Sequence, residues 1–180
     1  MGYVKWSYDT LNHFCGDVFK AFGFSEEEGS IIKDVLLTAD LYGIESHGMQ
    51  RMVRYHKGIE KGTIHPQAKP EVVFETPISA VIDGHNGMGQ LISHFAMEKA
   101  IEKAKTTGVG IVSVRNSNHL LQGIMRTWPV MKDFLEWHVP TPRRSWYRPS
   151  EERLCWVPTR SQLLCLQTRT RFSLTVRQQL

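Results

Sequence analysis

Two polar segments of this 180-residue chain contain side chains that could exchange a proton and hold a small acid. The first segment contains Ser46, His47 and Arg51. If a helix begins at about Ser46, then His47, Arg51 and Tyr55 follow at i, i+4 and i+8 and project from one face. The first turn of a helix disfavours a protonated imidazole, which would hold His47 near neutral. A guanidinium one turn further on can grip a carboxylate with two parallel hydrogen bonds.

Each segment also has a structural interpretation. His47 could cap a helix while Arg51 pairs with Glu45 or faces solvent, and a short Ser-His-Gly motif alone does not separate the two cases. The second segment, residues 115–119, reads Arg-Asn-Ser-Asn-His and directly follows an apolar strand. Loops at strand ends are where binding residues concentrate, but Asn and Ser also suit an exposed turn. On these residues alone, both interpretations stay open.

Three helices are predicted before residue 65. Ser7 is suited to cap a helix that ends at Gly23, and Ser25 begins a capping box that opens a second amphipathic helix. We expect these two helices to pack as an antiparallel pair. The third helix is expected to start at about Ser46 and to end at Gly58 or Gly62.

Strands and one long helix are predicted after residue 70. Residues 71–76 and 80–83 have the composition of short strands around Pro77, residues 90–107 that of an amphipathic helix, and residues 109–114 that of a buried strand. The glycines of the loop before the helix, Gly84, Gly87 and Gly89, fit neither the dinucleotide fingerprint nor a P-loop. They indicate either a tight turn or a direct phosphate contact. The fold class is therefore mixed α/β.

Three longer runs carry a resemblance to a known family. They are A-D-L-x-G-I-x-S-H-G-x-Q-R at residues 39–51, V-I-D-G-x-N-G-x-G-Q at 81–90 and G-V-G-I-V-S-V-R-N-S-N-H at 108–119. In this order they closely resemble the malate/L-lactate dehydrogenase family of type 2, with its ureidoglycolate, diketogulonate and cyclic imino-acid relatives. The resemblance covers residues 4–119, and departures such as Tyr42 and Glu45 leave the candidate site intact.

The resemblance implies an oxidoreductase that uses NAD or NADP to transfer hydride between a 2-hydroxy acid and its 2-oxo acid. The implied fold is a mixed sheet unlike the Rossmann type, in a homodimer. The two histidines of the motifs map to His47 and His119, the implied acid/base and substrate-polarising groups, in an order that the resemblance leaves open. Ser46, Arg51 and Tyr55 would contact the substrate. No metal is implied, and most cofactor-binding positions are expected beyond His119.

The composition changes abruptly near His119. Residues 1–119 hold nine Lys, three Arg and fourteen acidic residues, whereas residues 120–180 hold one Lys, nine Arg and four acidic residues, so the net charge passes from −2 to +6. All seven Ala and thirteen of the fourteen Gly precede the change. We therefore predict a family domain at residues 1–119 and a non-family tail at residues 120–180 that is irregular or disordered. The dehydrogenase would then be truncated, and we expect this fragment to be inactive.

A shifted reading frame would explain the tail. When codons are taken from the third base, Trp156 and Val157 force a glycine, and the next five residues permit Thr-Asn-Pro-Ile-Ala. Gly-Thr-Asn-Pro-Ile-Ala is a run that the resembled family carries in its cofactor region. In the same frame, residues 120–126 permit Ile-Thr-Gly-His-Tyr-Ala. The hypothesis is that residues 120–180 are translated out of frame.

The other function considered is a nucleic-acid-binding module. Its basis is a tail in which arginines alternate with Trp146, Tyr147 and Trp156, since such residues combine phosphate contacts with base stacking. No nucleic-acid fold motif accompanies it, so this alternative ranks second. Three cysteines without regular spacing and no long apolar run favour a reduced, cytoplasmic protein without a membrane span.

Overall fold

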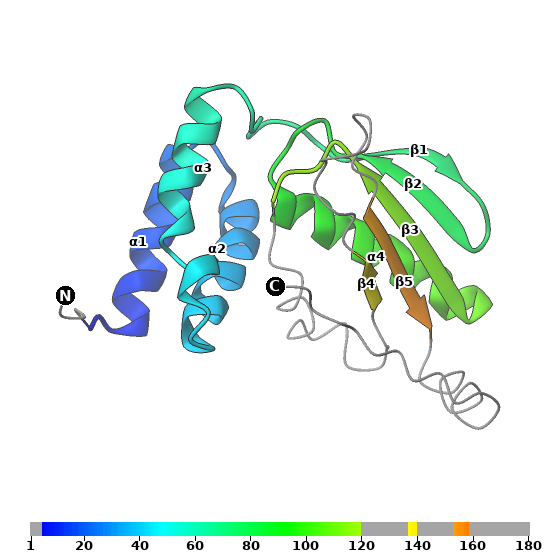
Figure 1. Cartoon of the computed structure of the whole chain (residues 1–180), viewed down its shortest axis with the longest axis horizontal. Helices are drawn as coiled ribbons and strands as arrows, with labels where there is room; N and C mark the ends of the chain where they lie inside the picture. Colours follow the sequence, from blue (N-terminus) through cyan, green and yellow to red (C-terminus); the bar gives the residue numbers. More distant parts are fainter. Residues whose placement is uncertain (1–4, 120–136, 140–152, 159–180) are drawn as a thin grey trace.

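The first two helices form where the sequence predicts them. The structure, a computed structural model, describes residues 5–119, 137–139 and 153–158. Helix α1 (Tyr8–Ala21) is capped by the Ser7 side chain, and α2 (Glu26–Leu41) begins with the complete capping box between Ser25 and Glu28. The two helices lie side by side and run in opposite directions (Figure 1). The predicted antiparallel pair is therefore confirmed.

The third helix starts later than predicted. Residues Glu45–His47 form a single 3-10 turn, η1, and the α-helix α3 spans Arg51–Glu60. The reason is a contact from another helix: Oδ2 of Asp40 accepts a hydrogen bond of 2.8 Å from the backbone N–H of Met49. A side chain that binds a backbone N–H offers the chain an alternative to continuous helix. The prediction that His47, Arg51 and Tyr55 share one helical face is therefore wrong, because His47 precedes the helix.

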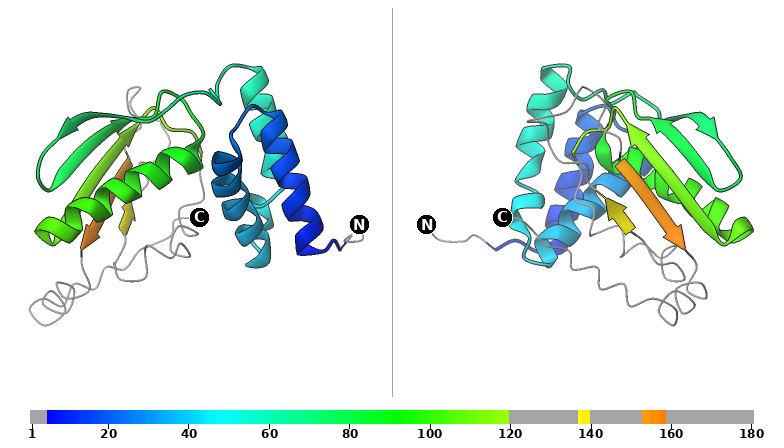
Figure 2. Two further views of the ribbon diagram at one scale, coloured as in Figure 1. Left: turned by 180° about the vertical axis from the view of Figure 1, so that it is seen from behind. Right: turned by 45° about the vertical axis from the view of Figure 1, so that its right-hand side comes forward.

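A mixed five-stranded sheet follows, in the order β1-β2-β3-β5-β4. Strand β1 (Glu71–Glu75) pairs antiparallel with β2 (Ser79–Asp83), and β2 pairs parallel with β3 (Val109–Arg115). Helix α4 (Gly89–Thr107) connects these parallel strands and lies across one face of the sheet (Figure 2). The predicted mixed α/β class is confirmed.

Two strands come from the segment for which the sequence predicts irregular structure. Strand β5 (Arg153–Pro158) pairs antiparallel with β3, and β4 (Trp137–Val139) pairs antiparallel with β5. Backbone pairing at a free strand edge needs no particular side chains, so a tail without a helical or strand pattern can still extend a sheet. The rest of residues 120–180 lies outside the described part of the chain, as do most residues concerned in the reading-frame and nucleic-acid hypotheses.

Helix α2 joins two hydrophobic clusters. Val35 and Ala39 pack with α4, β2 and β3, whereas Ile32 and Leu36 pack with α1 and α3. All four side chains are almost completely buried. The helical layer α1–α3 is thus fixed to the layer of α4 and the sheet through opposite sides of one helix. Among the described helices, none is long and apolar enough to cross a membrane.

Candidate functional site

The imidazoles of His47 and His119 lie against each other. Their ring centroids are 5.1 Å apart and their planes differ by 27°. His47 belongs to η1 in the helical layer, and His119 follows β3 in the sheet layer. The structure therefore brings together the two histidines that the sequence analysis selected, from segments distant in the sequence.

The neighbours of His47 favour its neutral form. Burial of the ring and, secondly, the positive charge of Arg51 lower the pKa of His47 from its ordinary value. The sequence also predicts a His47 that is held near neutral. The cause it predicts, a position in the first turn of a helix, does not apply. Oγ of Ser46 lies 2.8 Å from Nδ1 of His47, and Nε of Arg51 donates a 2.6 Å hydrogen bond to the carbonyl oxygen of Ser46. Ser46, His47 and Arg51 therefore form one contiguous group.

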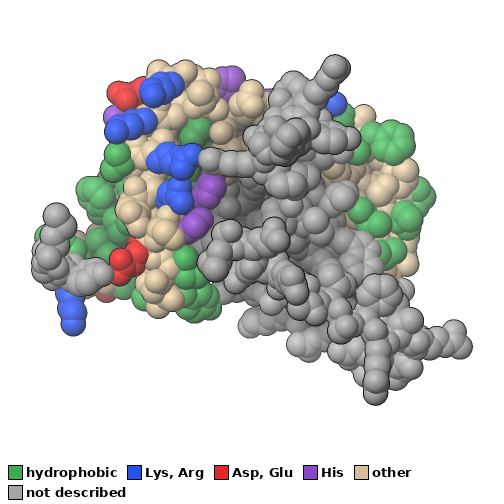
Figure 3. All heavy atoms as spheres, viewed as in Figure 1, with side chains coloured by type: hydrophobic (Ala, Val, Ile, Leu, Met, Phe, Trp, Pro, Cys, Tyr) green, Lys and Arg blue, Asp and Glu red, His purple; other side chains and the backbone are tan. Residues whose placement is uncertain are grey.

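Figure 3 shows Lys or Arg side chains beside His side chains on the helical half of one face of the molecule. Two arginines of α3, Arg51 and Arg54, carry positive charges that act to lower the pKa of the Tyr55 hydroxyl. A surface that combines fixed positive charge with imidazoles suits an anionic small molecule that exchanges a proton.

The turn that carries His47 is held by Asp40 of α2. A Cβ atom added to Gly48 would lie 1.7 Å from Oδ1 of Asp40, so the carboxylate occupies the space that any side chain at residue 48 would need. The amide of Gln50 also donates to the carbonyl oxygen of Glu45 and closes the turn. The glycine of the Ser-His-Gly motif thus leaves room for the Asp40 carboxylate that bonds the Met49 N–H.

The loop that carries His119 is built around Asp83, the last residue of β2. This carboxylate is only 5% exposed and accepts hydrogen bonds from Nε of Arg115, Nδ2 of Asn116 and the backbone N–H of His85. Burial alone would raise the pKa of Asp83, but these hydrogen bonds outweigh it and lower the pKa below the ordinary value. Arg115 and Asn116 therefore organise the loop, and Asp83 is a functional-site residue that the sequence analysis did not single out.

The glycine-rich loop before α4 packs against the chain's own backbone. A Cβ atom at Gly89 would lie 2.4 Å from the carbonyl oxygen of Asn118, and one at Gly84 would lie 2.9 Å from that of Asn116. Gly87 donates a 2.8 Å hydrogen bond back to the carbonyl oxygen of Gly84, closing a tight turn. The tight-turn interpretation of this loop is confirmed. The backbone N–H groups of Gly84, Asn86 and Gly87 all donate to carbonyl oxygens of the chain itself, so they are not available to a cofactor phosphate.

Tyr55 lies away from the exposed face of the site. Its side chain is 3% exposed, and its hydroxyl accepts a 2.8 Å hydrogen bond from Nε2 of Gln90, itself 1% exposed. Burial raises the pKa of this hydroxyl, partly offset by Gln90 and the arginines of α3. Tyr55 thus connects α3 to the start of α4, and its direct contact with a substrate stays a prediction.

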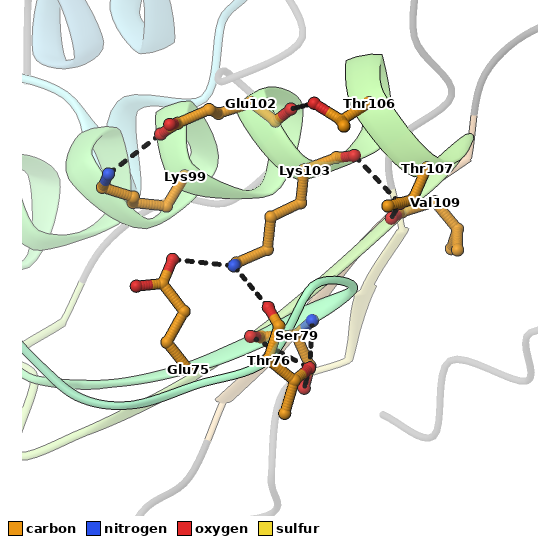
Figure 4. Close-up of polar contacts among 9 residues, drawn as sticks. All are labelled: Glu75, Thr76, Ser79, Lys99, Glu102, Lys103, Thr106, Thr107 and Val109. Carbon is orange, nitrogen blue, oxygen red and sulfur yellow. Dashed lines mark hydrogen bonds and ion pairs between the residues drawn. The ribbon is translucent and has the colours of Figure 1, made fainter.

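A separate polar cluster lies toward the other end of α4 (Figure 4). Lys103, 8% exposed, donates 2.7 Å hydrogen bonds to Oε1 of Glu75 and to the carbonyl oxygen of Thr76. It fixes the β1–β2 hairpin to α4 and takes no part in the histidine pair. In the described part of the chain, no group of three or more His, Cys, Asp or Glu side chains could hold a metal ion.

A family model described as malate/L-lactate dehydrogenase matches residues 6–134. The chain belongs to this family. The match passes the composition change at His119, so the predicted boundary between residues 119 and 120 stays a prediction.

Three relatives in this dehydrogenase family match between 57% and 66% of the chain. A malate dehydrogenase of Pyrococcus abyssi is 47% identical over 117 residues, covering 65% of this chain and 32% of that protein. An L-sulfolactate dehydrogenase of Methanocaldococcus jannaschii is 48% identical over 103 residues, covering 57% and 30%. The solved structure of malate dehydrogenase from Pyrococcus horikoshii OT3 matches with a TM-score of 0.63 at 44% identity, covering 66% and 36%. The chain thus spans about a third of the length of these relatives.

Proposed function

We propose that this chain carries the acid/base and substrate-orienting residues of an NAD(P)-dependent 2-hydroxy-acid dehydrogenase. The observation that supports this most directly is the stacked pair of His47 and His119 beside Arg51. The printed activities of the relatives, malate and sulfolactate dehydrogenation, fit the same substrate class. We further propose that the intact enzyme is a cytoplasmic homodimer.

In the proposed reaction His47 is the proton-transfer group. Its lowered pKa leaves the imidazole neutral at pH 7, so the ring can take the hydroxyl proton of a 2-hydroxy acid and return it in the reverse direction. Ser46 orients that ring through the contact at Nδ1. His119, whose ring stacks on that of His47, would polarise the reacting oxygen.

Arg51 is proposed to hold the substrate carboxylate. Its Nε is bonded to the carbonyl oxygen of Ser46, which fixes the plane of the guanidinium and leaves the terminal nitrogens to face an anion. A fixed carboxylate places the neighbouring carbon and its hydroxyl near the imidazoles. Orientation of this kind accounts for a large share of rate enhancement in enzymes.

The nicotinamide cofactor, NAD or NADP, would supply the hydride acceptor. The described residues fit the substrate end of such a site through the histidine pair and Arg51. The glycine-rich loop does not offer its amides to the phosphates, because the N–H groups of Gly84, Asn86 and Gly87 donate to carbonyl oxygens of the chain itself. We therefore propose that the cofactor's phosphates bind outside this loop.

The experiment that tests this function uses two proteins. One is the 180-residue chain, for which we expect little or no reduction of oxaloacetate or pyruvate with NADH or NADPH. The other is the product of the gene with its reading frame restored after codon 119, for which we expect turnover. Robust turnover by the 180-residue chain would overturn the first expectation. The reading-frame hypothesis would be overturned by a nucleotide sequence across codons 115–130 that does not continue the family pattern in a shifted frame.

Substitutions in the restored enzyme assign the roles. We expect His47→Ala to lower kcat by about 100-fold or more, the usual contribution of a positioned general acid/base. Arg51→Lys keeps the charge but loses the planar fork, so it should raise KM more than it lowers kcat. A His47→Ala enzyme with unchanged kcat would exclude His47 as the proton-transfer group.

A further inference from the structure

The side chain of Asn118, next to His119, makes an unusual set of contacts. Its Nδ2 lies 3.1 Å from the carbonyl oxygen of Thr63, 2.8 Å from that of Asn86 and 2.9 Å from that of Gly87. An amide NH2 has two hydrogens, so three acceptors at these distances use its whole donor capacity with one hydrogen shared.

The three acceptors belong to different parts of the fold. Thr63 follows α3 and is tied to it by a 2.9 Å hydrogen bond from its N–H to the carbonyl oxygen of Gly58. Asn86 and Gly87 lie in the tight turn between β2 and α4. Asn118 therefore connects the helical layer that carries His47 to the sheet layer that carries His119.

Two other hydrogen bonds join the chain around α3 to the turn and α4 without involving the loop at residues 115–119: Nε2 of Gln90 donates to the Tyr55 hydroxyl, and the N–H of His65 donates to the carbonyl oxygen of Asn86. Asp83, Arg115 and Asn116 bond to one another within the sheet layer. The Asn118 and His119 carbonyls occupy the space that a side chain at Gly89 of α4 would need, and α4 is also part of that layer. These contacts fix the loop relative to the sheet, and the hydrogen bond from Asn118 to Thr63 links the loop itself to the segment that follows α3.

We propose that Asn118 is a positioning residue that sets the contact between the imidazoles of His47 and His119. It does so by joining the end of α3 to the turn that precedes α4, one residue before His119. The importance of this contact for catalysis rests on the proposed function, but the contact itself can be measured without any enzymatic activity.

The test is an NMR measurement of the ring protons of His47 in the 180-residue chain, well above the ordinary His pKa of about 6.5 so that neutral rings are compared. His119→Ala defines the resonance of His47 without its stacked neighbour. We expect Asn118→Ala to move the His47 resonance at least halfway from its parent position toward this reference. Ser117→Ala, which removes only a local hydrogen bond to the Asn118 carbonyl, should leave it in place.

A general loss of stability is controlled separately. Lys103→Ala loosens the hairpin at the other end of α4 and should leave the His47 resonance unchanged although it lowers the free energy of unfolding. An unchanged resonance in folded Asn118→Ala would overturn the proposal, as would an equal shift in Lys103→Ala or no shift in His119→Ala.

If Asn118→Ala does not fold, the same measurement is made on Asn118→Ser, whose shorter side chain keeps one hydroxyl donor at this position. We expect a smaller shift in the same direction, and no shift there would overturn the proposal. Failure of the dehydrogenase assay with the restored enzyme would count against the proposed function and would leave this measurement intact.

Discussion

A single added methyl group at Gly89 is predicted to destabilise the chain and to displace the His119 loop. An Ala Cβ there would lie 2.4 Å from the carbonyl oxygen of Asn118 and 2.6 Å from that of His119. Real Cβ contacts do not fall below 3.0 Å, so the loop would have to move by at least 0.6 Å (3.0 minus 2.4). Both obstructing atoms belong to the backbone, which cannot swing aside as a flexible side chain would.

The magnitude follows from two opposing effects. Inserting a methyl into a tightly packed region typically costs about 1–3 kcal/mol. Replacing Gly by Ala inside a helix gains at most about 1 kcal/mol from helix propensity, and Gly89 is the first residue of α4, where that gain is smaller. The clash therefore prevails, and we expect Gly89→Ala to lower the free energy of unfolding by about 1–2 kcal/mol.

Gly16 provides the matched control. It lies inside α1, and a Cβ atom there meets nothing within 4 Å. The same substitution, Gly16→Ala, should therefore raise the free energy of unfolding by about 0.5–1 kcal/mol. Urea denaturation of the parent and both variants measures the difference. If Gly89→Ala proves as stable as Gly16→Ala, the close packing of the His119 loop on α4 is refuted.

Three further outcomes are expected. The pKa of His47 is lowered in the folded state, so as the pH falls the unfolded chain takes up a proton at His47 at a higher pH than the folded chain does. The free energy of unfolding should therefore decrease as the pH drops below the ordinary His pKa toward the folded value. His47→Gln should flatten this decrease in unfolding experiments from pH 8 to 5. Lys103→Met removes a charged donor from the Thr76 carbonyl and should cost about 1–2 kcal/mol in urea denaturation, whereas Glu75→Gln, which leaves that bond intact, should cost less. Burial raises the pKa of the Cys15 thiol to about 11. In a chain lacking the other two cysteines, iodoacetamide should therefore label Cys15 only when the protein unfolds. Rapid labelling of the folded protein would contradict the burial of Cys15.

Local signals in the sequence were sufficient for most of the fold. Ser7 and Ser25 cap their helices through contacts within three residues, and such short-range contacts are visible in the sequence. The sequence patterns that predict the strands and α4 are equally local. The start of α3 was missed because the decisive contact, from Asp40 to Met49, comes from the end of another helix. The motif containing Ser46 and Gly48 fits a helix start, and only the position of the Asp40 carboxylate shows that the chain turns instead.

The site was predicted in a similar, partial way. The resemblance selected His47 and His119, but neither spacing nor composition could show that their rings stack, since the contact depends on the packing of two layers. Tyr55 follows Arg51 at helical spacing, but it also lies three residues after Met52, and the side chains of Met52 and Tyr55 pack into the same buried cluster. Asp83 and Gln90 belong to the run at residues 81–90 that carries the resemblance. Their supporting roles could not be predicted from it, because a buried acceptor or donor is defined by its partners.

The arrangement of the cores explains why the histidine pair needs several supports. Ile32 and Leu36 anchor α2 to the helical cluster, while Val35 and Ala39 anchor it to the cluster under the sheet. Apolar packing of this kind is strong but non-directional, so it brings the two layers together without fixing the distance between two rings. Directional hydrogen bonds can fix it: Asp40 to Met49 on the side of His47, and Asn118 to three carbonyls on the side of His119. Substitutions in the apolar clusters should therefore change stability first, whereas substitutions of these polar side chains should change the geometry of the pair even when the fold persists.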